Sequence, residues 1–193
     1  EQAGVEVNQY VFPEDIFQEA LVDEIRKINA DDSIHGVLMF RPLPKHIDEK
    51  TVCEALDPAK DMDGVTSGSM AGVFMDSEIG YPPCTAEAVM EILDYYGVEL
   101  KGKRVTIFGR SLVIGKPAAM MAMRRHATIT VCHSRTTAED FANAGSSAEI
   151  VIAALGRARM VGTDKLGEGQ VIIDVGINVD DEGKLCGDVD FEQ

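Results

Sequence analysis

The segment that most constrains the fold covers residues 103–125, KRVTIFGRSLVIGKPAAMMAMRR. An apolar run predicts a short buried strand, and Gly109 and Gly115 bracket a loop that leads into a helix with Pro117 at its first position. The first turn of a helix has backbone N–H groups without helical partners, so the segment predicts a phosphate-binding loop. Because five residues separate the glycines, the spacing is not GxGxxG, and a tight turn without a ligand is the alternative.

A second predicted strand, residues 127–135 (ATITVCHSR), completes a strand–helix–strand unit. NAD-binding units of this kind carry an Asp or Glu about 20 residues after the glycines, where it bonds the ribose 2′-hydroxyl. This chain has His133, Ser134 and Arg135 there instead. Since a hydroxyl and a guanidinium can bind a 2′-phosphate that a carboxylate would repel, the turn predicts NADP as the cofactor. The alternative is a solvated basic turn.

The charge of the chain limits its partners. A formal net charge of −15 and a sequence pI near 4.6 disfavour binding to nucleic acid or to an anionic membrane. No apolar run approaches the ~20 residues needed to span a bilayer, and no leader-like segment opens the sequence. We therefore expect a soluble cytoplasmic protein that binds neither nucleic acid nor membrane.

The cysteines are far apart, with no CxxC pair and no Cys/His spacing typical of a metal site. This pattern predicts free thiols in a reducing compartment and no bound metal. The four residues are Cys53, Cys84, Cys132 and Cys186.

The N-terminal part predicts helices and one buried strand. Apolar residues recur at three- and four-residue spacing over residues 16–29, as in an amphipathic helix. The run GVLMF, residues 36–40, predicts a parallel strand covered on both faces, and Asp48 predicts the N-cap of a short second helix. A stretch rich in Gly, Ser and Met at residues 64–83 predicts a linker, so we expect a domain boundary there.

Strands and helices alternate in the C-terminal part. Thr85 predicts the N-cap of a helix that leads into the phosphate-binding unit. After that unit, the pattern predicts a helix at residues 138–144, an apolar strand that ends at Gly156 and a strand at residues 171–178. Such alternation implies a parallel sheet.

These observations predict an α/β fold with two lobes. We expect an N-terminal α/β substrate lobe in residues 1–82, and a C-terminal Rossmann-type NADP-binding domain with a parallel sheet in residues 83–193.

Several motifs occur in one order and spacing: GVLMFRPLPKHID, PAKDMDG, PPCT, GRSLVIGKP, VCHSRT, IVIAALG and IDVGIN. Together they resemble the methylenetetrahydrofolate dehydrogenase/cyclohydrolase family called FolD, and the resemblance covers nearly the whole chain. It implies a homodimer with a folate cleft between an N-terminal lobe and an NADP-binding Rossmann domain. The implied reaction is NADP-dependent oxidation of 5,10-methylenetetrahydrofolate to the 5,10-methenyl form, followed by hydrolysis to 10-formyltetrahydrofolate.

The resemblance also implies roles for particular residues. Asp63 of KDMDG matches the aspartate that bonds the pterin ring, and it is our candidate catalytic-site residue; a carboxylate can accept two bonds from the pterin amino and ring N–H groups. The candidate cofactor residues combine the motif matches with the two predicted turns. They are Thr85, Gly109, Arg110, Ser111, Gly115, His133, Ser134, Arg135, Gly156 and Ile177.

The sequence departs from the family pattern in three places. Phe40 stands where the family usually has a Gln that tunes the catalytic lysine, which puts the cyclohydrolase step in question. The Tyr-x-x-x-Lys helix of the family would precede Glu1, and its PVPGGVGPMT loop would follow Gln193. We therefore expect these 193 residues to be the middle of a longer protein and to be inactive by themselves.

Two alternative functions stay open. Phe40 favours a dehydrogenase without cyclohydrolase activity. The absence of the family lysine from this sequence favours a non-catalytic NADP-binding module.

Overall fold

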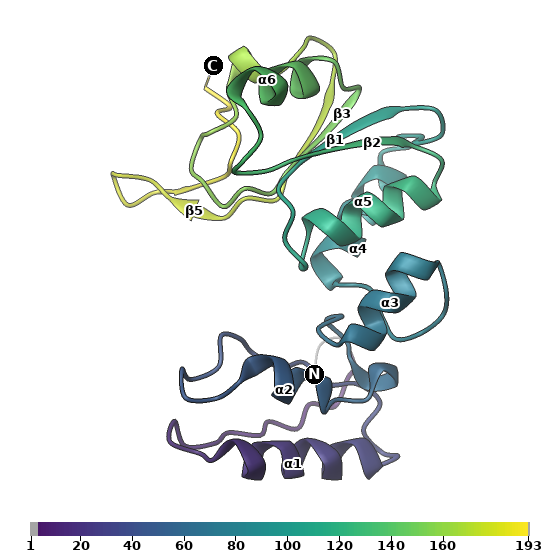
Figure 1. The fold of residues 1–193 in the computed structure, drawn as a ribbon, viewed down its shortest axis with the longest axis vertical. Coiled ribbons are helices and arrows are strands. Elements are labelled where there is room, and N and C mark those ends of the chain that lie inside the picture. Colours follow the sequence, from purple (N-terminus) through teal and green to yellow (C-terminus); the bar gives the residue numbers. More distant parts are fainter. Residues whose placement is uncertain (1–3, 193) are drawn as a thin grey trace.

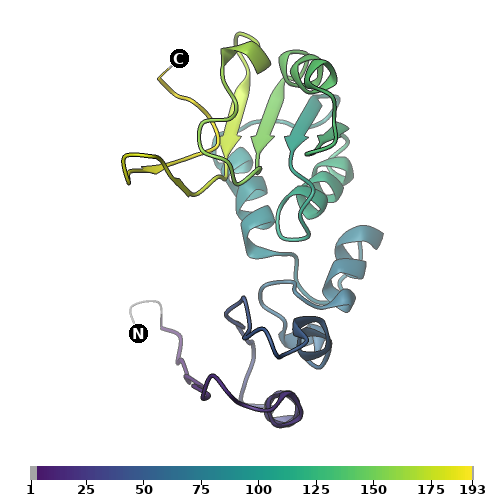
Figure 2. The ribbon, with the colours of Figure 1, turned by 60° about the vertical axis from the view of Figure 1, so that its left-hand side comes forward.

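The computed structural model describes residues 4–192 and shows two lobes stacked along the long axis of the molecule (Figure 1). The N-terminal lobe contains α1 (Gln18–Ala30), α2 (Glu49–Glu54) and the 3-10 turn η1 (Pro58–Lys60). The C-terminal lobe contains the sheet and α4 (Cys84–Tyr95), and α3 (Ser67–Met75) lies between the two lobes (Figure 2). The α/β class with two lobes is therefore confirmed.

The C-terminal sheet is parallel, with the order β2-β1-β3-β4 in the described part of the chain. It lies between α6 on one face and α4 with α5 on the other (Figure 1). Each face buries its own apolar cluster, as expected for strands covered on both sides. The elements are β1 (Arg104–Phe108), α5 (Gly115–Arg124), β2 (Thr128–Cys132), α6 (Ala138–Ser146), β3 (Ile150–Ala153) and β4 (Val171–Asp174).

The prediction of a linker without regular structure at residues 64–83 is wrong, because the segment contains the nine-residue helix α3. Thr66 caps this helix by accepting a hydrogen bond from the backbone N–H of Ser69. A Cβ on Gly72 would lie 2.1 Å from the carbonyl oxygen of Ile79, so the glycine permits close backbone packing. The small residues of this segment are typical of a linker sequence, but in the folded protein they allow α3 to pack tightly.

The prediction of a buried strand at residues 36–40 is also wrong. In the described residues this segment forms only an isolated parallel bridge between Val37 and Asp61. Leu38 and Phe40 are 59% and 82% exposed, so the run is not covered on both faces. A strand needs a neighbour over several residues, and the described part of this lobe supplies one only at Val37.

Several boundaries differ from the prediction. Helix α4 begins at Cys84 with Pro83 as its N-cap, so Thr85 is not the cap that the sequence indicated. Helix α5 begins at Gly115, two residues before Pro117. Asp48 is the N-cap of α2, as predicted, and accepts a bond from the backbone of Lys50.

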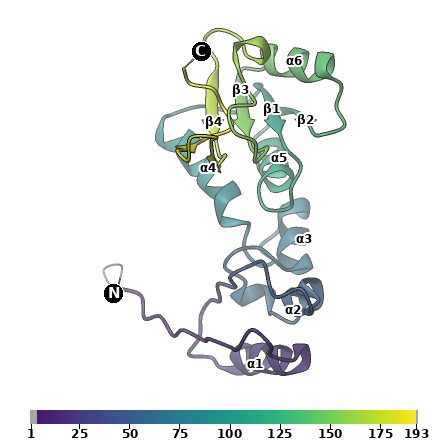
Figure 3. The ribbon, with the colours of Figure 1, turned by 90° about the vertical axis from the view of Figure 1, so that its left-hand side faces the viewer.

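The last predicted strand is shorter than residues 171–178. It ends at Asp174, and the chain then forms an antiparallel hairpin of β5 (Asn178–Val179) and β6 (Leu185–Cys186). The 3-10 turn η2 (Thr163–Lys165) precedes β4. Figure 3 shows this hairpin extending from the sheet on the side of β4.

Candidate functional site

The loops after β1 and β3 meet where the strand order reverses, which is the point where open parallel sheets bind ligands. Gly109 has a φ of 126°, and a Cβ there would lie 2.2 Å from the carbonyl oxygen of Ala154. A Cβ on Gly115 would lie 2.3 Å from the carbonyl oxygen of Gly109. Neither glycine can carry a Cβ without striking backbone, so the loop between them folds tightly into a glycine cradle of the form that a dinucleotide phosphate needs.

Ser111 organises the loop between the glycines. Its Oγ accepts hydrogen bonds from the backbone N–H of Ile114 (3.1 Å) and Gly115 (3.4 Å), and its carbonyl accepts from Lys116. The expectation that the first turn offers these N–H groups to an anion is therefore wrong for this conformation. The exposed side chain of Arg110 at the same edge remains a charged donor for a phosphate.

The turn after β2 lies beside this cradle, since the backbone N–H of Gly109 donates to the carbonyl of Cys132 at 2.9 Å. His133 anchors the turn: its N–H donates to Thr136 Oγ1, and its Nδ1 accepts from the N–H of Arg135. The side chains of Ser134 and Arg135 are exposed. The structure therefore brings the two predicted cofactor turns together at one edge of the sheet.

Gly156 and Ile177 follow β3 and β4 at the same edge. Gly156 has a φ of 64°, and Ile177 is 82% exposed. Both loops are tied to the buried carboxylate of Asp188, which sequence reasoning missed. The short motif GDVD contains Asp188, but an acidic residue near the end of a hairpin gives no sign of burial.

The predicted folate residue Asp63 lies on the N-terminal lobe, where its Oδ2 is 3.6 Å from Arg41 Nη2. Arg41 is joined to Pro42 by a cis peptide bond and also lies 3.7 Å from Glu49. Sequence reasoning missed Arg41, although it directly follows the noted Phe40. The pair gives Asp63 a cationic neighbour and leaves its carboxylate partly exposed.

The loop carrying Asp63 contacts the start of α4. Gly64 has a φ of 61°, and a Cβ there would lie 2.6 Å from the backbone nitrogen of Pro83. Cys84 Sγ donates to the carbonyl of Met62 at 2.9 Å. These contacts bring the loop of Asp63, the candidate folate residue, next to Thr85, a candidate cofactor residue.

Cys84, the first residue of α4, is exposed. Local burial of the thiol, and then the charge of Asp63, raise the pKa of Cys84. Because the thiolate is the nucleophile, a raised pKa argues against a nucleophilic role. All four cysteines are free, as predicted.

Asp61 is fully buried and organises the loop from within. It accepts bonds from the backbone N–H of Val65 (3.0 Å) and Thr66 (2.8 Å) and from Ser69 Oγ (2.7 Å). Burial raises the pKa of Asp61, but these bonds together lower it by more, so the net pKa lies below the ordinary value. Lys60 is also structural, because its Nζ donates to the carbonyls at the end of α1.

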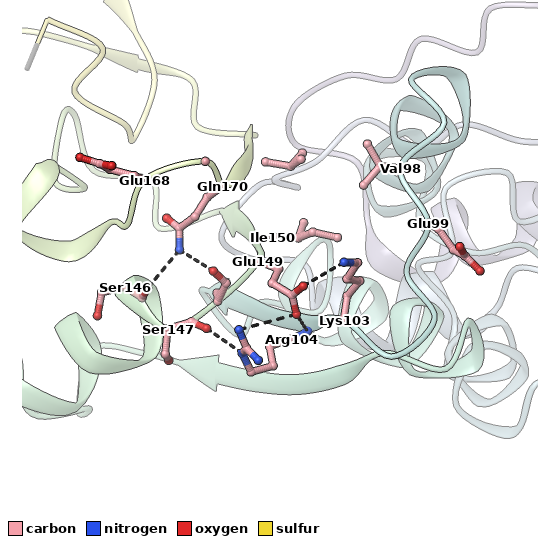
Figure 4. A pocket seen from close by; sticks show the side chains of 13 residues that line it. Val98, Glu99, Lys103, Arg104, Ser146, Ser147, Glu149, Ile150, Glu168 and Gln170 are labelled. Carbon is pink, nitrogen blue, oxygen red and sulfur yellow. Dashed lines mark hydrogen bonds and ion pairs between the residues drawn. The ribbon is translucent and has the colours of Figure 1, made fainter.

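A cavity of about 600 Å³ lies at the opposite edge of the sheet, where β1, β3 and β4 begin (Figure 4). Both basic side chains of its lining are paired with Glu149: Lys103 Nζ lies 2.9 Å and Arg104 Nη2 lies 3.7 Å from its carboxylate. Gln170 donates to the carbonyl of Ala148. The cavity therefore offers an anionic ligand no unpaired basic side chain among its lining residues, and it lies at the opposite edge of the sheet from the predicted cofactor turns.

Within residues 4–192, no helix has both the length and the apolar character needed to cross a membrane. In the same residues, no group of three or more His, Cys, Asp or Glu side chains is arranged to hold a metal ion.

A parallel sheet with a glycine cradle at its carboxyl edge, joined to a second lobe that presents a carboxylate, defines a two-lobed dinucleotide-binding protein. The family model for the tetrahydrofolate dehydrogenase/cyclohydrolase NAD(P)-binding domain matches residues 83–193, and the catalytic-domain model matches residues 1–63. The chain belongs to the tetrahydrofolate dehydrogenase/cyclohydrolase family, which confirms the resemblance drawn from the motifs.

Known relatives agree with this assignment. The chain is 48% identical over 195 residues to the bifunctional protein FolD of Carboxydothermus hydrogenoformans, covering 100% of this chain and 67% of the relative. A crystal structure of FolD from Campylobacter jejuni matches with a TM-score of 0.88 and 38% identity, covering 93% of this chain and 63% of that one. The Trypanosoma brucei FolD, complexed with NADP cofactor and inhibitor, matches with a TM-score of 0.84, 34% identity and the same two shares. The chain thus spans about two thirds of the length of its relatives.

Proposed function

We propose that the protein oxidises 5,10-methylenetetrahydrofolate to 5,10-methenyltetrahydrofolate with NADP+, and hydrolyses the product to 10-formyltetrahydrofolate. The observation that carries this proposal is the contact of Gly64 with Pro83, which joins the Asp63 loop to the helix leading into the cofactor domain. The names of the relatives support the same pair of activities. We also propose the domain division at residues 1–82 and 83–193.

The carboxyl edge of the C-terminal sheet would hold NADP through the residues that follow β1 and β2. The cradle between Gly109 and Gly115 admits a pyrophosphate, with Arg110 and Ser111 beside it. His133 shapes the turn from which Ser134 and Arg135 bind the 2′-phosphate. The Trypanosoma brucei relative, complexed with NADP cofactor, supports this assignment.

The substrate side would place the pterin against Asp63, with its one-carbon unit toward Thr85, Gly156 and Ile177. Bound NADP+ supplies the hydride acceptor. The task of this chain is to hold the two rings in contact and to exclude water during transfer. The carboxylate of Asp63 fixes the pterin by accepting its N–H groups, while Arg41 fixes the carboxylate.

A dehydrogenase without the hydrolytic step is the second candidate. Phe40, at the position of the family Gln, is 82% exposed and offers no hydrogen bond to a lysine. Because Lys60 caps α1, it cannot readily take over proton transfer in the second step. We therefore propose that the 193 residues alone bind NADP weakly and do not turn over folate. By themselves they would then act as a non-catalytic NADP-binding module.

An NADP-linked absorbance assay with methylenetetrahydrofolate tests the proposal. NADPH should form only when both substrates are present, and a coupled assay for the formyl product separates the bifunctional enzyme from the dehydrogenase. Failure to reduce NADP+ in a chain extended to the length of its relatives would refute the dehydrogenase. Turnover by the 193 residues alone would refute their proposed inactivity. We further propose that the protein is cytoplasmic and forms a homodimer; sedimentation of the purified protein tests the homodimer, and cell fractionation tests the location.

A further inference from the structure

The carboxylate of Asp188 is fully buried and ties two loops together. One oxygen, Oδ2, accepts the backbone N–H of Leu155 (2.5 Å) and Gly156 (3.1 Å). The other, Oδ1, accepts the N–H of Arg157 (2.8 Å) and the side-chain Nδ2 of Asn178 (2.9 Å). Three of the donors lie in the loop that follows β3, and Asn178 is the first residue of β5, directly after the loop that follows β4, so one side chain sets the position of both loops.

The backbone around Asp188 is itself held in place. Val161 and Val189 form a parallel bridge, and the N–H of Val161 donates to the carbonyl of Asp188 at 2.9 Å. The carboxylate of Asp174, the last residue of β4, accepts the N–H of Asp188 (3.0 Å) and of Val189 (2.9 Å). Val189 is buried in the cluster beneath α6. The carboxylate of Asp188 is therefore fixed relative to the sheet.

Two glycines make room for these carboxylates. A Cβ on Gly176 would lie 2.4 Å from Asp188 Cγ, and a Cβ on Gly187 would lie 1.9 Å from Asp174 Oδ2. Larger residues at either position would displace a carboxylate. The sheet, Asp174, Asp188 and the two loops thus form one chain of direct contacts.

The tips of the two loops are open on their outer side. Gly156 has a left-handed conformation with no described atom within 4 Å of a Cβ built there, and Ile177 is 82% exposed. Both tips lie at the carboxyl edge of the sheet, where a dinucleotide binds. We infer that Asp188 is a positioning residue that holds Gly156 and Ile177 against the nicotinamide end of the cofactor; this rests on the proposed function.

The variant Asp188→Asn tests the inference because it keeps the shape but replaces one oxygen with an NH₂ group. Each carboxylate oxygen accepts bonds from two donors. In either orientation of the amide, the NH₂ group of Asn would therefore face two N–H donors and lose both hydrogen bonds. The Kd for NADP, measured by calorimetry, should rise about tenfold or more. Amide hydrogen exchange in residues 155–157 should accelerate without cofactor present. Folate binding at Asp63 should not change.

The control is Asp181→Asn, an exposed residue of the same hairpin, which should change neither NADP affinity nor exchange. If Asp188→Asn does not fold, Asn178→Ala removes one of the four donors and should still raise the Kd, by about threefold. Unchanged NADP affinity and exchange in the folded variants would overturn this inference alone. Failure of the unmodified protein to bind NADP would overturn the proposed function together with it.

Discussion

The guanidinium of Arg41 lies 3.6 Å from the carboxylate of Asp63, and this pair joins two separate segments of the N-terminal lobe. The side chains are 27% and 24% exposed, so the pair is partly shielded from water and remains accessible to a ligand. A carboxylate has four lone-pair sites, and one cationic neighbour leaves most of them free. Asp63 can therefore keep its place and still accept bonds from a substrate.

We predict that Asp63→Ala weakens folate binding by about tenfold or more and leaves NADP binding unchanged, because the two ligands contact different lobes. Calorimetry with each ligand measures the effect. Asp32→Ala, an exposed loop residue, serves as the control. Equal loss of both ligands would show that Asp63 supports the fold instead.

We predict that Arg135→Glu reverses the preference for NADP over NAD. Arg135 is exposed at the end of β2, where a guanidinium can form charge-assisted bonds of about 1.5–3 kcal/mol with a 2′-phosphate and a carboxylate would repel it. Titration of each dinucleotide checks the prediction. If the unmodified protein binds NAD as tightly as NADP, the assignment of this turn is wrong.

We predict that Gly109→Ala abolishes measurable NADP binding or unfolds the C-terminal lobe. The new methyl group would lie 2.2 Å from the carbonyl oxygen of Ala154, and the backbone φ of 126° is unfavourable for any L side chain. Gly169→Ala is the matched control, since it also has a positive φ but no described atom within 4 Å. NADP titration and thermal unfolding should show a loss of affinity or of stability for Gly109→Ala and not for Gly169→Ala. Equal affinity and stability of the two variants would contradict the need for glycine in the cradle.

We predict that Asp61 makes the folded protein sensitive to acid. Its folded pKa lies below the ordinary value, so the stability it contributes is present above about pH 3.9 and is lost as the pH falls through the folded pKa. Urea unfolding of the unmodified protein and Asp61→Ala should therefore give free energies that converge as the pH falls below about 4. A constant difference over that range would contradict this role.

The sequence determined the elements whose signals are local. Apolar runs bounded by glycine and polar turns predicted β1, α5 and β2, and Asp48 predicted the start of α2 by its ability to cap a helix. Contiguous motifs predicted the family, and the parallel sheet followed from the alternation of strands and helices.

Only the tertiary structure decided features that depend on distant partners. The run at residues 36–40 had the composition of a buried strand but lacks the neighbour that a strand requires over several residues. The glycine-rich stretch became α3 because close backbone packing favoured small residues. Arg41 and Asp188 are separated in sequence from the groups that they bind, so burial and pairing gave them roles that no local pattern contains.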